Sequence, residues 1–125
     1  MRTKKLVLVF GTYDLLHSGH LYFLKQAKKH GTSLAVVVAR DKTVCEVKGK
    51  KPVHNENQRL SRLKKLPIVD NAYLGNLTDK HKIIVDLRPD IICLGYDQTS
   101  FTDNLAQVLK QKGMPTKIVR IKKAY

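Results

Sequence analysis

The chain has 125 residues, of which 24 are Lys or Arg and 10 are Asp or Glu, so its formal charge at pH 7 is +14. This length predicts one domain, residues 1–125, and 42% hydrophobic residues suffice for an ordinary core. The longest apolar runs, such as Leu6–Phe10 and Leu34–Ala39, are far shorter than the roughly 20 residues of a membrane-spanning helix. We therefore expect no membrane span, and the positive charge favours a polyanionic partner.

The amino terminus and the cysteines indicate the compartment. Only five apolar residues precede Gly11, whereas the apolar region of a secretory signal needs about 7–15. Cys45 and Cys93 match no CxxC spacing, so we predict two thiols rather than a disulfide, with Cys93 in the core. Both observations favour a cytoplasmic protein.

The first half of the chain alternates apolar runs with amphipathic stretches. Leu6–Phe10 and Leu34–Ala39 are predicted strands, separated by a helix with Leu21, Leu24 and Ala27 on one face. The following stretch, Arg40–Asn55, fits neither template, so we predict a long connection. It carries four lysines, and a connection of this length inside a compact domain is more often functional than idle; the lysines are Lys42, Lys48, Lys50 and Lys51.

The second half continues the alternation. Three further helices are predicted from shared apolar faces, and three further strands from short aliphatic runs. In chain order these are the helix of Leu60, Leu63 and Leu66, the strand Ala72–Leu74, the helix of Ile83, Ile84 and Leu87, the strand Ile91–Leu94, the helix of Leu105, Val108 and Leu109, and the strand Ile118–Ile121.

Strands that alternate with helices form βαβ units, which predict an α/β fold: a Rossmann-like, doubly wound, five-stranded parallel sheet covered on both faces. In such sheets ligands bind beyond the carboxyl ends of the strands, near the point where strand order reverses. The turn after the first strand is therefore the first place to look for a site.

That turn, from Gly11 to His20, has the features of a phosphate site. Gly11 allows a ligand to approach the backbone closely, and the helix that follows offers free N–H groups to an anion. His17 and His20, three residues apart, face the same way on the first helical turn and can donate hydrogen bonds to phosphate oxygens. An ordinary surface or helix-capping role is one alternative for these histidines. Zinc binding is another, but the other His and Cys residues show no complementary spacing. Neither GxGxxG nor GxxxxGK[ST] occurs.

The segment Gly11–Asp14 followed by His17-Ser18-Gly19-His20 resembles the signature of the cytidylyltransferase-like nucleotidyltransferases, whose HxGH motif binds nucleotide phosphates. Further segments within residues 6–100 are similar to the archaeal FAD synthases; they are Ala39–Val44, Val47–Val53, Glu56–Arg59, Arg88–Ile92 and Leu94–Thr99. The resemblance implies transfer of AMP from ATP to FMN, which gives FAD and pyrophosphate, with Mg²⁺ as the divalent cation.

The resemblance also implies roles for individual residues. His17 and His20 match the residues that contact the α- and β-phosphates, Lys48 and Lys50 match lysines of a mobile loop over the triphosphate, and Arg59 matches a basic position near the phosphates. Asp97 matches an acidic position at the nucleotide end of the pocket, with a turn Asp as the alternative. The motif assigns the rest of nucleotide binding to Gly11, Thr12, Tyr13, Asp14 and Gly19, with a helix N-cap as the alternative for Asp14.

The sequence departs from the family after Ile118–Ile121, where relatives carry a Ser/Thr-rich motif that contacts phosphates; Arg120 is the only residue there that offers a substitute. Two other functions remain open. One keeps the fold with CTP as donor and glycerol 3-phosphate or a sugar phosphate as acceptor. The other is a non-catalytic nucleic-acid-binding module, against which stand the scattered basic residues and the lack of a known reading motif. A homodimer is compatible with so small a domain.

Overall fold

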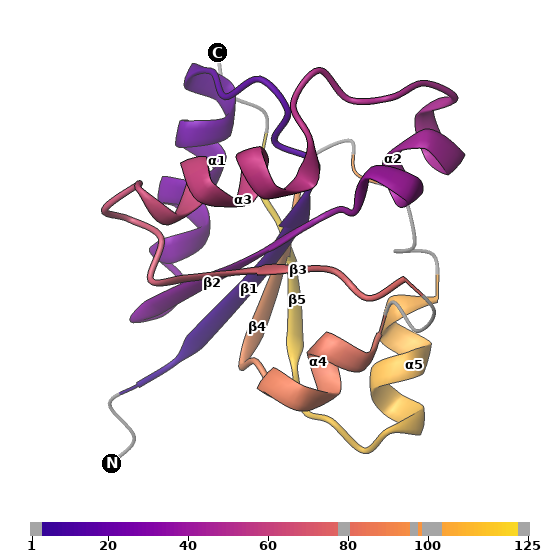
Figure 1. Cartoon of the computed structure of the whole chain (residues 1–125). Helices are drawn as coiled ribbons and strands as arrows, with labels where there is room; N and C mark the ends of the chain where they lie inside the picture. The colour runs from indigo at the N-terminus through magenta and orange to yellow at the C-terminus, as the bar shows by residue number, and fades with distance from the viewer. Residues whose placement is uncertain (1–3, 78–80, 96–97, 99–103, 123–125) are drawn as a thin grey trace.

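The computed structural model describes residues 4–77, 81–95, 98 and 104–122. Its centre is a parallel sheet of five strands in the order β3-β2-β1-β4-β5 (Figure 1). The first two strands run to the same edge, since Leu6 pairs with Ser33 and Gly11 with Val38. The strand bounds are β1 Leu6–Gly11, β2 Ser33–Val38, β3 Asn71–Leu74, β4 Ile91–Leu94 and β5 Lys117–Arg120.

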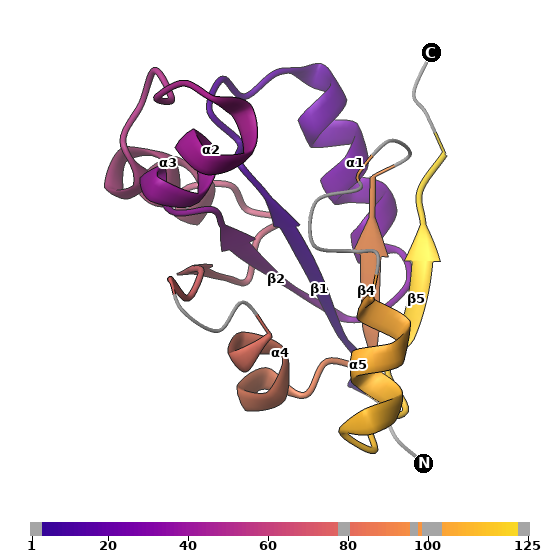
Figure 2. The same cartoon turned by 90° about the vertical axis from the view of Figure 1, so that its right-hand side faces the viewer.

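Four helices cover the two faces of the sheet. In Figures 1 and 2, α1 (Ser18–Lys28) and α3 (Glu56–Lys64) lie on one face, and α4 (Lys82–Leu87) and α5 (Leu105–Gln111) lie on the other. Alternate residues of β1 divide between the two layers: Val7 and Val9 pack with Leu24 of α1, while Leu8 packs with Ile84 of α4. The three central strands, β1, β2 and β4, are therefore buried on both faces, which is why they appear in the sequence as continuous apolar runs.

The order of the strands reverses beside β1. The chain proceeds from β1 to β2 to β3 on one side and then crosses back, so that β4 and β5 lie on the other side. The carboxyl ends of β1 and β4 therefore flank the switch point, where doubly wound sheets bind ligands.

The predicted fold is confirmed, with the five strands displaced by at most one residue at either end. The four predicted helices are also present, but Leu21 is 40% exposed and does not join the core face of α1. Both cysteines are free thiols and Cys93 is buried, as predicted. In the part of the chain that the structure describes, no helix combines the length and apolar content needed to cross a membrane.

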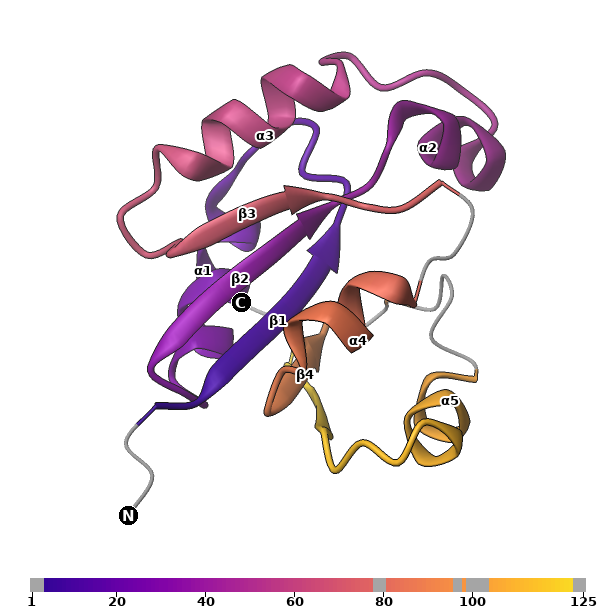
Figure 3. The same cartoon turned by 60° about the horizontal axis from the view of Figure 1, so that its bottom comes forward.

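The prediction for Arg40–Asn55 was wrong, because a further helix, α2 (Asp41–Lys48), begins directly after β2. Only one side chain of α2, Val44, is buried, and four of its eight residues are charged, so its apolar face is too short to identify the helix from the sequence. The helix ends at Gly49, whose φ of 74° is left-handed and suits glycine. Figure 3 shows α2 beyond the carboxyl ends of β1 and β2, opposite the start of α1.

Candidate active site

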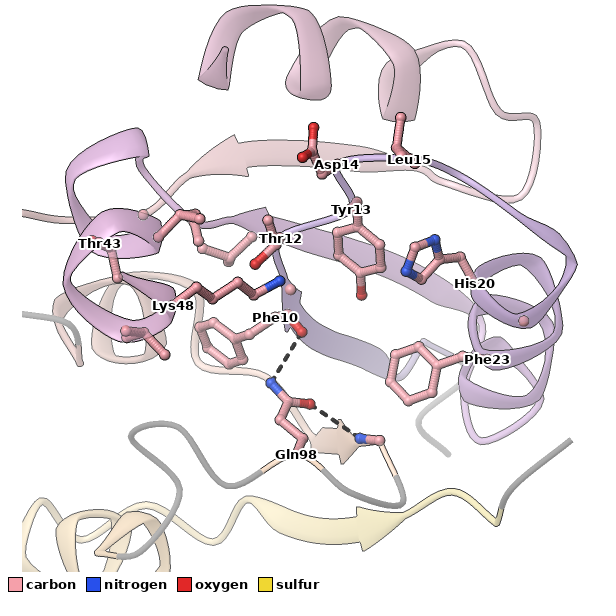
Figure 4. A pocket seen from close by; sticks show the side chains of 18 of the residues that line it. Phe10, Thr12, Tyr13, Asp14, Leu15, His20, Phe23, Thr43, Lys48 and Gln98 are labelled. Atoms are coloured by element: carbon pink, nitrogen blue, oxygen red, sulfur yellow. Dashed lines mark hydrogen bonds between the residues drawn. The ribbon is translucent and has the colours of Figure 1, made fainter. Parts of the chain in front are cut away.

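A cavity of about 870 Å³ lies at the carboxyl edge of the sheet. The cavity is lined by residues that follow each of the five strands, by the first turns of α1 and by one side of α2 (Figure 4). Of the predicted site residues, the lining includes Gly11, Thr12, Tyr13, Asp14, His17, Gly19, His20 and Lys48. A volume of this size is that of a typical small-molecule site.

The turn after β1 is held in an unusual backbone conformation. Tyr13 has a φ of +52°, rare for a bulky side chain, and its ring is buried over Gly11. A Cβ on Gly11 would lie 2.5 Å from the Tyr13 ring, so only glycine fits beneath this tyrosine. The strained turn brings Thr12 to the cavity wall.

The two histidines of the turn form a stacked pair at the start of α1. Their ring centroids are 4.0 Å apart, with 20° between the ring planes. His17 is the N-cap of α1 and its Nδ1 accepts a hydrogen bond of 3.0 Å from the Gly19 N–H, which leaves Nε2 as the protonated nitrogen. A Cβ on Gly19 would lie 2.8 Å from the His17 ring, so the glycine of the motif makes room for this cap.

His20 is the more enclosed member of the pair. Its Nδ1 is buried and has no hydrogen-bond partner among the described residues, and Tyr13 packs edge-on against its ring at 5.3 Å. Burial lowers the pKa of His20, and the nearby His17 and Lys48 lower it further, although the Leu15 backbone opposes them. The imidazole is therefore neutral at neutral pH, and an incoming phosphate would favour its protonation.

The two predicted lysines have different places. Lys48, the last residue of α2, lines the cavity, and its ammonium group points into the cavity near Thr12 (Figure 4). Lys50 lies beyond the end of the helix, is exposed, and is not part of the cavity lining.

Arg59 lies behind the turn instead of in the cavity, in contrast to the phosphate contact that the sequence predicts. Its side chain is fully buried, and Nε donates to the His54 carbonyl at 3.0 Å. One terminal nitrogen donates to the carbonyls of Thr12, at 2.9 Å, and Ala39, at 2.8 Å. The other bonds the Asp41 carboxylate at 2.8 Å. The guanidinium thus links the turn after β1, the end of β2 and the start of α2.

Asp14 holds the segment that follows α2. Its two carboxylate oxygens accept hydrogen bonds from the backbone N–H groups of Val53, at 2.7 Å, and His54, at 2.8 Å. Burial acts to raise the pKa of Asp14, but these two hydrogen bonds and the charges of His54 and Arg59 hold the pKa below its ordinary value. Asp14 is therefore a carboxylate whose acceptors are already used by the protein.

Sequence reasoning assigned no role to Gln98, which also lines the cavity. Its side chain bonds both Phe10 and Gly95 (Figure 4). Gln98 has no titratable group, and its only signal in the sequence is its place directly after Asp97, within the Leu94–Thr99 segment. Arg120 donates to the carbonyls of Gly95 and Gln98. Asp97 itself lies outside the described residues.

Among the residues that the structure describes, the site offers few protein ligands for a metal ion. Within residues 4–77, 81–95, 98 and 104–122, no three His, Cys, Asp or Glu side chains lie close enough to bind a metal ion. The carboxylates of Asp14 and Asp41 are engaged by backbone amides and by Arg59. A divalent cation would therefore enter with its substrate, bound mainly by phosphate oxygens.

Sequence comparisons identify relatives of the whole domain. Residues 8–123 match the cytidylyltransferase-like family. The FAD synthase of Methanosarcina barkeri is 47% identical over 115 residues, which are 92% of this chain and 81% of that protein. The FAD synthase of Thermoplasma volcanium is 44% identical over 94% of this chain and 82% of that protein.

Two solved structures share the fold. A crystal structure described as the lipopolysaccharide core biosynthesis protein of Thermoplasma volcanium matches with a TM-score of 0.91 and 43% identity, covering 98% of this chain and 99% of that one. The pantoate-β-alanine ligase of Francisella tularensis matches with a TM-score of 0.62 and 17% identity, covering 97% of this chain and 60% of that one, and shows the fold alone. The family match, these identities and the HxGH turn at the switch point show that the chain is a nucleotidyltransferase of the cytidylyltransferase-like family.

Proposed function

We propose that this nucleotidyltransferase transfers the adenylyl group of ATP to the phosphate of FMN and releases pyrophosphate, which makes it an FAD synthase. The observation that carries the proposal is the stacked pair of His17 and His20, which lines a cavity of about 870 Å³ at the switch point of the sheet. The proposal of FMN as acceptor comes from relatives 44–47% identical that bear the name FAD synthase.

The reaction joins two anions and needs alignment and charge neutralisation more than covalent chemistry. An oxygen of the FMN phosphate attacks the α-phosphorus of ATP, the bond from that phosphorus to the bridging oxygen breaks, and the electron pair leaves with pyrophosphate. Negative charge therefore grows on the β-phosphate side as the reaction proceeds. The groups of the site that can stabilise this charge are the N–H groups at the start of α1, the histidine pair and the Lys48 ammonium.

The histidines are suited to complementary roles in this proposal. His17, with its Nδ1 bonded to the helix, presents Nε2–H as a fixed donor to a phosphate oxygen. His20 is neutral before substrate binds and has an unpaired buried Nδ1, so it can gain a proton when the triphosphate arrives. We assign to this pair the stabilisation of charge on the leaving pyrophosphate.

The remaining predicted residues complete the proposal. Lys50 would reach the triphosphate from the segment after α2, and Asp97 would contact the nucleoside. Arg59 would act indirectly, since it holds the Thr12 carbonyl and the start of α2 in place. The family generally uses a divalent cation, and we propose that it is Mg²⁺, bound to the triphosphate. We propose a cytoplasmic location, which suits a reaction that consumes ATP. A homodimer is a separate proposal, which gel filtration would test.

A second candidate keeps the site and changes the acceptor to a sugar phosphate. It is favoured by the name of the Thermoplasma volcanium structure, lipopolysaccharide core biosynthesis protein, whose chain is 43% identical to this one. CTP with glycerol 3-phosphate is the third pair to test. These acceptors present the same phosphate nucleophile, so the histidine pair serves them equally.

A pyrophosphate-release screen tests the proposal: ATP or CTP is combined with FMN, glycerol 3-phosphate or sugar phosphates in the presence of magnesium. We expect release with ATP and FMN, with FAD confirmed by chromatography. His17→Ala and His20→Ala should abolish release while the circular dichroism of the fold persists. His30→Ala, which removes an exposed histidine beyond α1, is the matched control.

Each part of this proposal has its own contrary result. Wild-type turnover in both histidine variants would refute the catalytic assignment. Release with a sugar phosphate but not with FMN would replace the first candidate by the second. Absence of release with every pair, together with nucleic-acid binding that weakens steeply with salt, would support a binding module instead.

A further inference from the structure

The pairing between β1 and β4 stops before β1 ends. On its other side, β1 pairs with β2 as far as Gly11, opposite Val38. Against β4, the paired register runs only from Val7 to Val9, opposite Ile91 to Cys93. Beyond Val9 the two strands part, and this is the switch point at the floor of the cavity.

The side chain of Gln98 bridges this gap. Its Nε2 donates to the Phe10 carbonyl at 3.1 Å, and its Oε1 accepts from the Gly95 N–H at 3.0 Å (Figure 4). A glutamine amide has the same donor and acceptor as a peptide group. The Gln98 side chain therefore replaces one further pair of backbone hydrogen bonds between β1 and Gly95, the residue that follows β4.

The bridge is itself anchored on both sides. The Gln98 backbone N–H donates to the Gly95 carbonyl at 3.2 Å. Arg120, at the end of β5, donates to the Gly95 carbonyl at 2.6 Å and to the Gln98 carbonyl at 3.0 Å. The amide of Gln98 is thus held in one position relative to the ends of three strands.

We propose that Gln98 is a positioning residue for the donor nucleotide: its side-chain amide sets the spacing between the ends of β1 and β4, across which the nucleotide lies. In doubly wound sheets a mononucleotide occupies the crevice at the switch point. The adjoining turn carries His17 and His20, so a change in this spacing moves the donor relative to the groups that contact its phosphates. The inference rests on nucleotide binding by the family and does not depend on which acceptor is used.

Two variants separate the amide bridge from other effects. Gln98→Met keeps the length of the side chain and removes both hydrogen bonds without adding charge. Gln98→Glu retains the acceptor for Gly95 but, when ionised, cannot donate to the Phe10 carbonyl. Once protonated, its carboxyl group again has one donor and one acceptor. Gln107→Met, at an exposed position of α5, is the matched control.

We expect Gln98→Met to raise the KM for ATP about tenfold, as the loss of two modest hydrogen bonds would predict. The kcat should fall less than about threefold, since the reacting groups are intact, and the KM for the acceptor should not change. For Gln98→Glu, the KM for ATP should approach the wild-type value measured at the same pH as the pH is lowered, because the protonated carboxyl group again donates to the Phe10 carbonyl. The Gly95 amide should exchange with solvent faster in Gln98→Met.

Calorimetric titration with ATP alone separates this inference from the proposed function. If wild type binds ATP but makes no FAD, and Gln98→Met binds ATP more weakly, the proposed acceptor is wrong and the role of Gln98 stands. If Gln98→Met binds ATP as wild type does and its KM for ATP and kcat are both unchanged, the positioning role is refuted. If the KM for ATP of Gln98→Glu, relative to wild type, did not change with pH, the amide bridge would not be the cause of the weaker ATP binding.

Discussion

Replacement of Arg59 by Met is the most direct test of how the site is held together. The Arg59 side chain is fully buried, and Met occupies a similar path without any donor. The substitution removes hydrogen bonds to the carbonyls of His54, Thr12 and Ala39 and to the carboxylate of Asp41. No large cavity is created, so the loss of these bonds dominates the change in the free energy of unfolding.

The expected magnitude follows from what each acceptor becomes. A buried acceptor that loses its donor costs about 1–3 kcal/mol, and the lower value applies here because the carbonyls lie in part-buried surroundings. The side chain of Asp41 is 38% exposed, so water replaces its lost partner at small cost. Three carbonyls at roughly 1 kcal/mol each give a destabilisation of about 3 kcal/mol.

Urea unfolding followed by circular dichroism measures this loss. The control is Arg62→Met on the same helix, since Arg62 is exposed and its guanidinium contacts the His54 ring; the substitution should cost less than about 0.5 kcal/mol. Arg59→Lys keeps the charge but not the planar fork, so it should fall between the two. The KM for ATP should rise in parallel with the loss of stability.

A different pattern would refute this account of Arg59. If Arg59→Met were as stable as Arg62→Met, the buried fork would not be what holds the turn. If both Arg59 variants weakened ATP binding at unchanged stability, Arg59 would contact phosphate directly, as the sequence resemblance suggests. The two roles are therefore distinguished by stability and not by activity alone.

Two further substitutions test the turn and the segment after α2. Gly19→Ala should lower kcat at least about tenfold, because its Cβ would lie 2.8 Å from the His17 ring, while the free energy of unfolding should change by less than about 1 kcal/mol; wild-type kcat would show that the position of His17 does not matter. Asp14→Asn should destabilise by about 1–2 kcal/mol and speed tryptic cleavage after Lys48 and Lys50, since the Val53 and His54 amides lose a charged acceptor; unchanged cleavage would show that Asp14 does not anchor this segment.

The fold was readable from the sequence because its determinants are local. Strands buried on both faces appear as continuous aliphatic runs, and the helices α1, α3, α4 and α5 bury enough of one face to leave a periodic pattern. The helix α2 escaped prediction because it buries only Val44 and lies over the edge of the sheet. With four charged residues among eight, its apolar face is too short to be recognised from the sequence.

By itself the sequence determined the parallel α/β sheet and the turn after β1 that carries His17, Gly19 and His20, since the spacing of these three residues acts within one turn of one helix. The tertiary structure decided the positions of the side chains that are held by long-range contacts. It turned Arg59 away from the cavity toward three carbonyls, and it placed Gln98 across the gap between β1 and β4. The sequence cannot show such contacts, because a hydrogen bond between residues 88 positions apart depends on how the sheet closes rather than on either residue's neighbours.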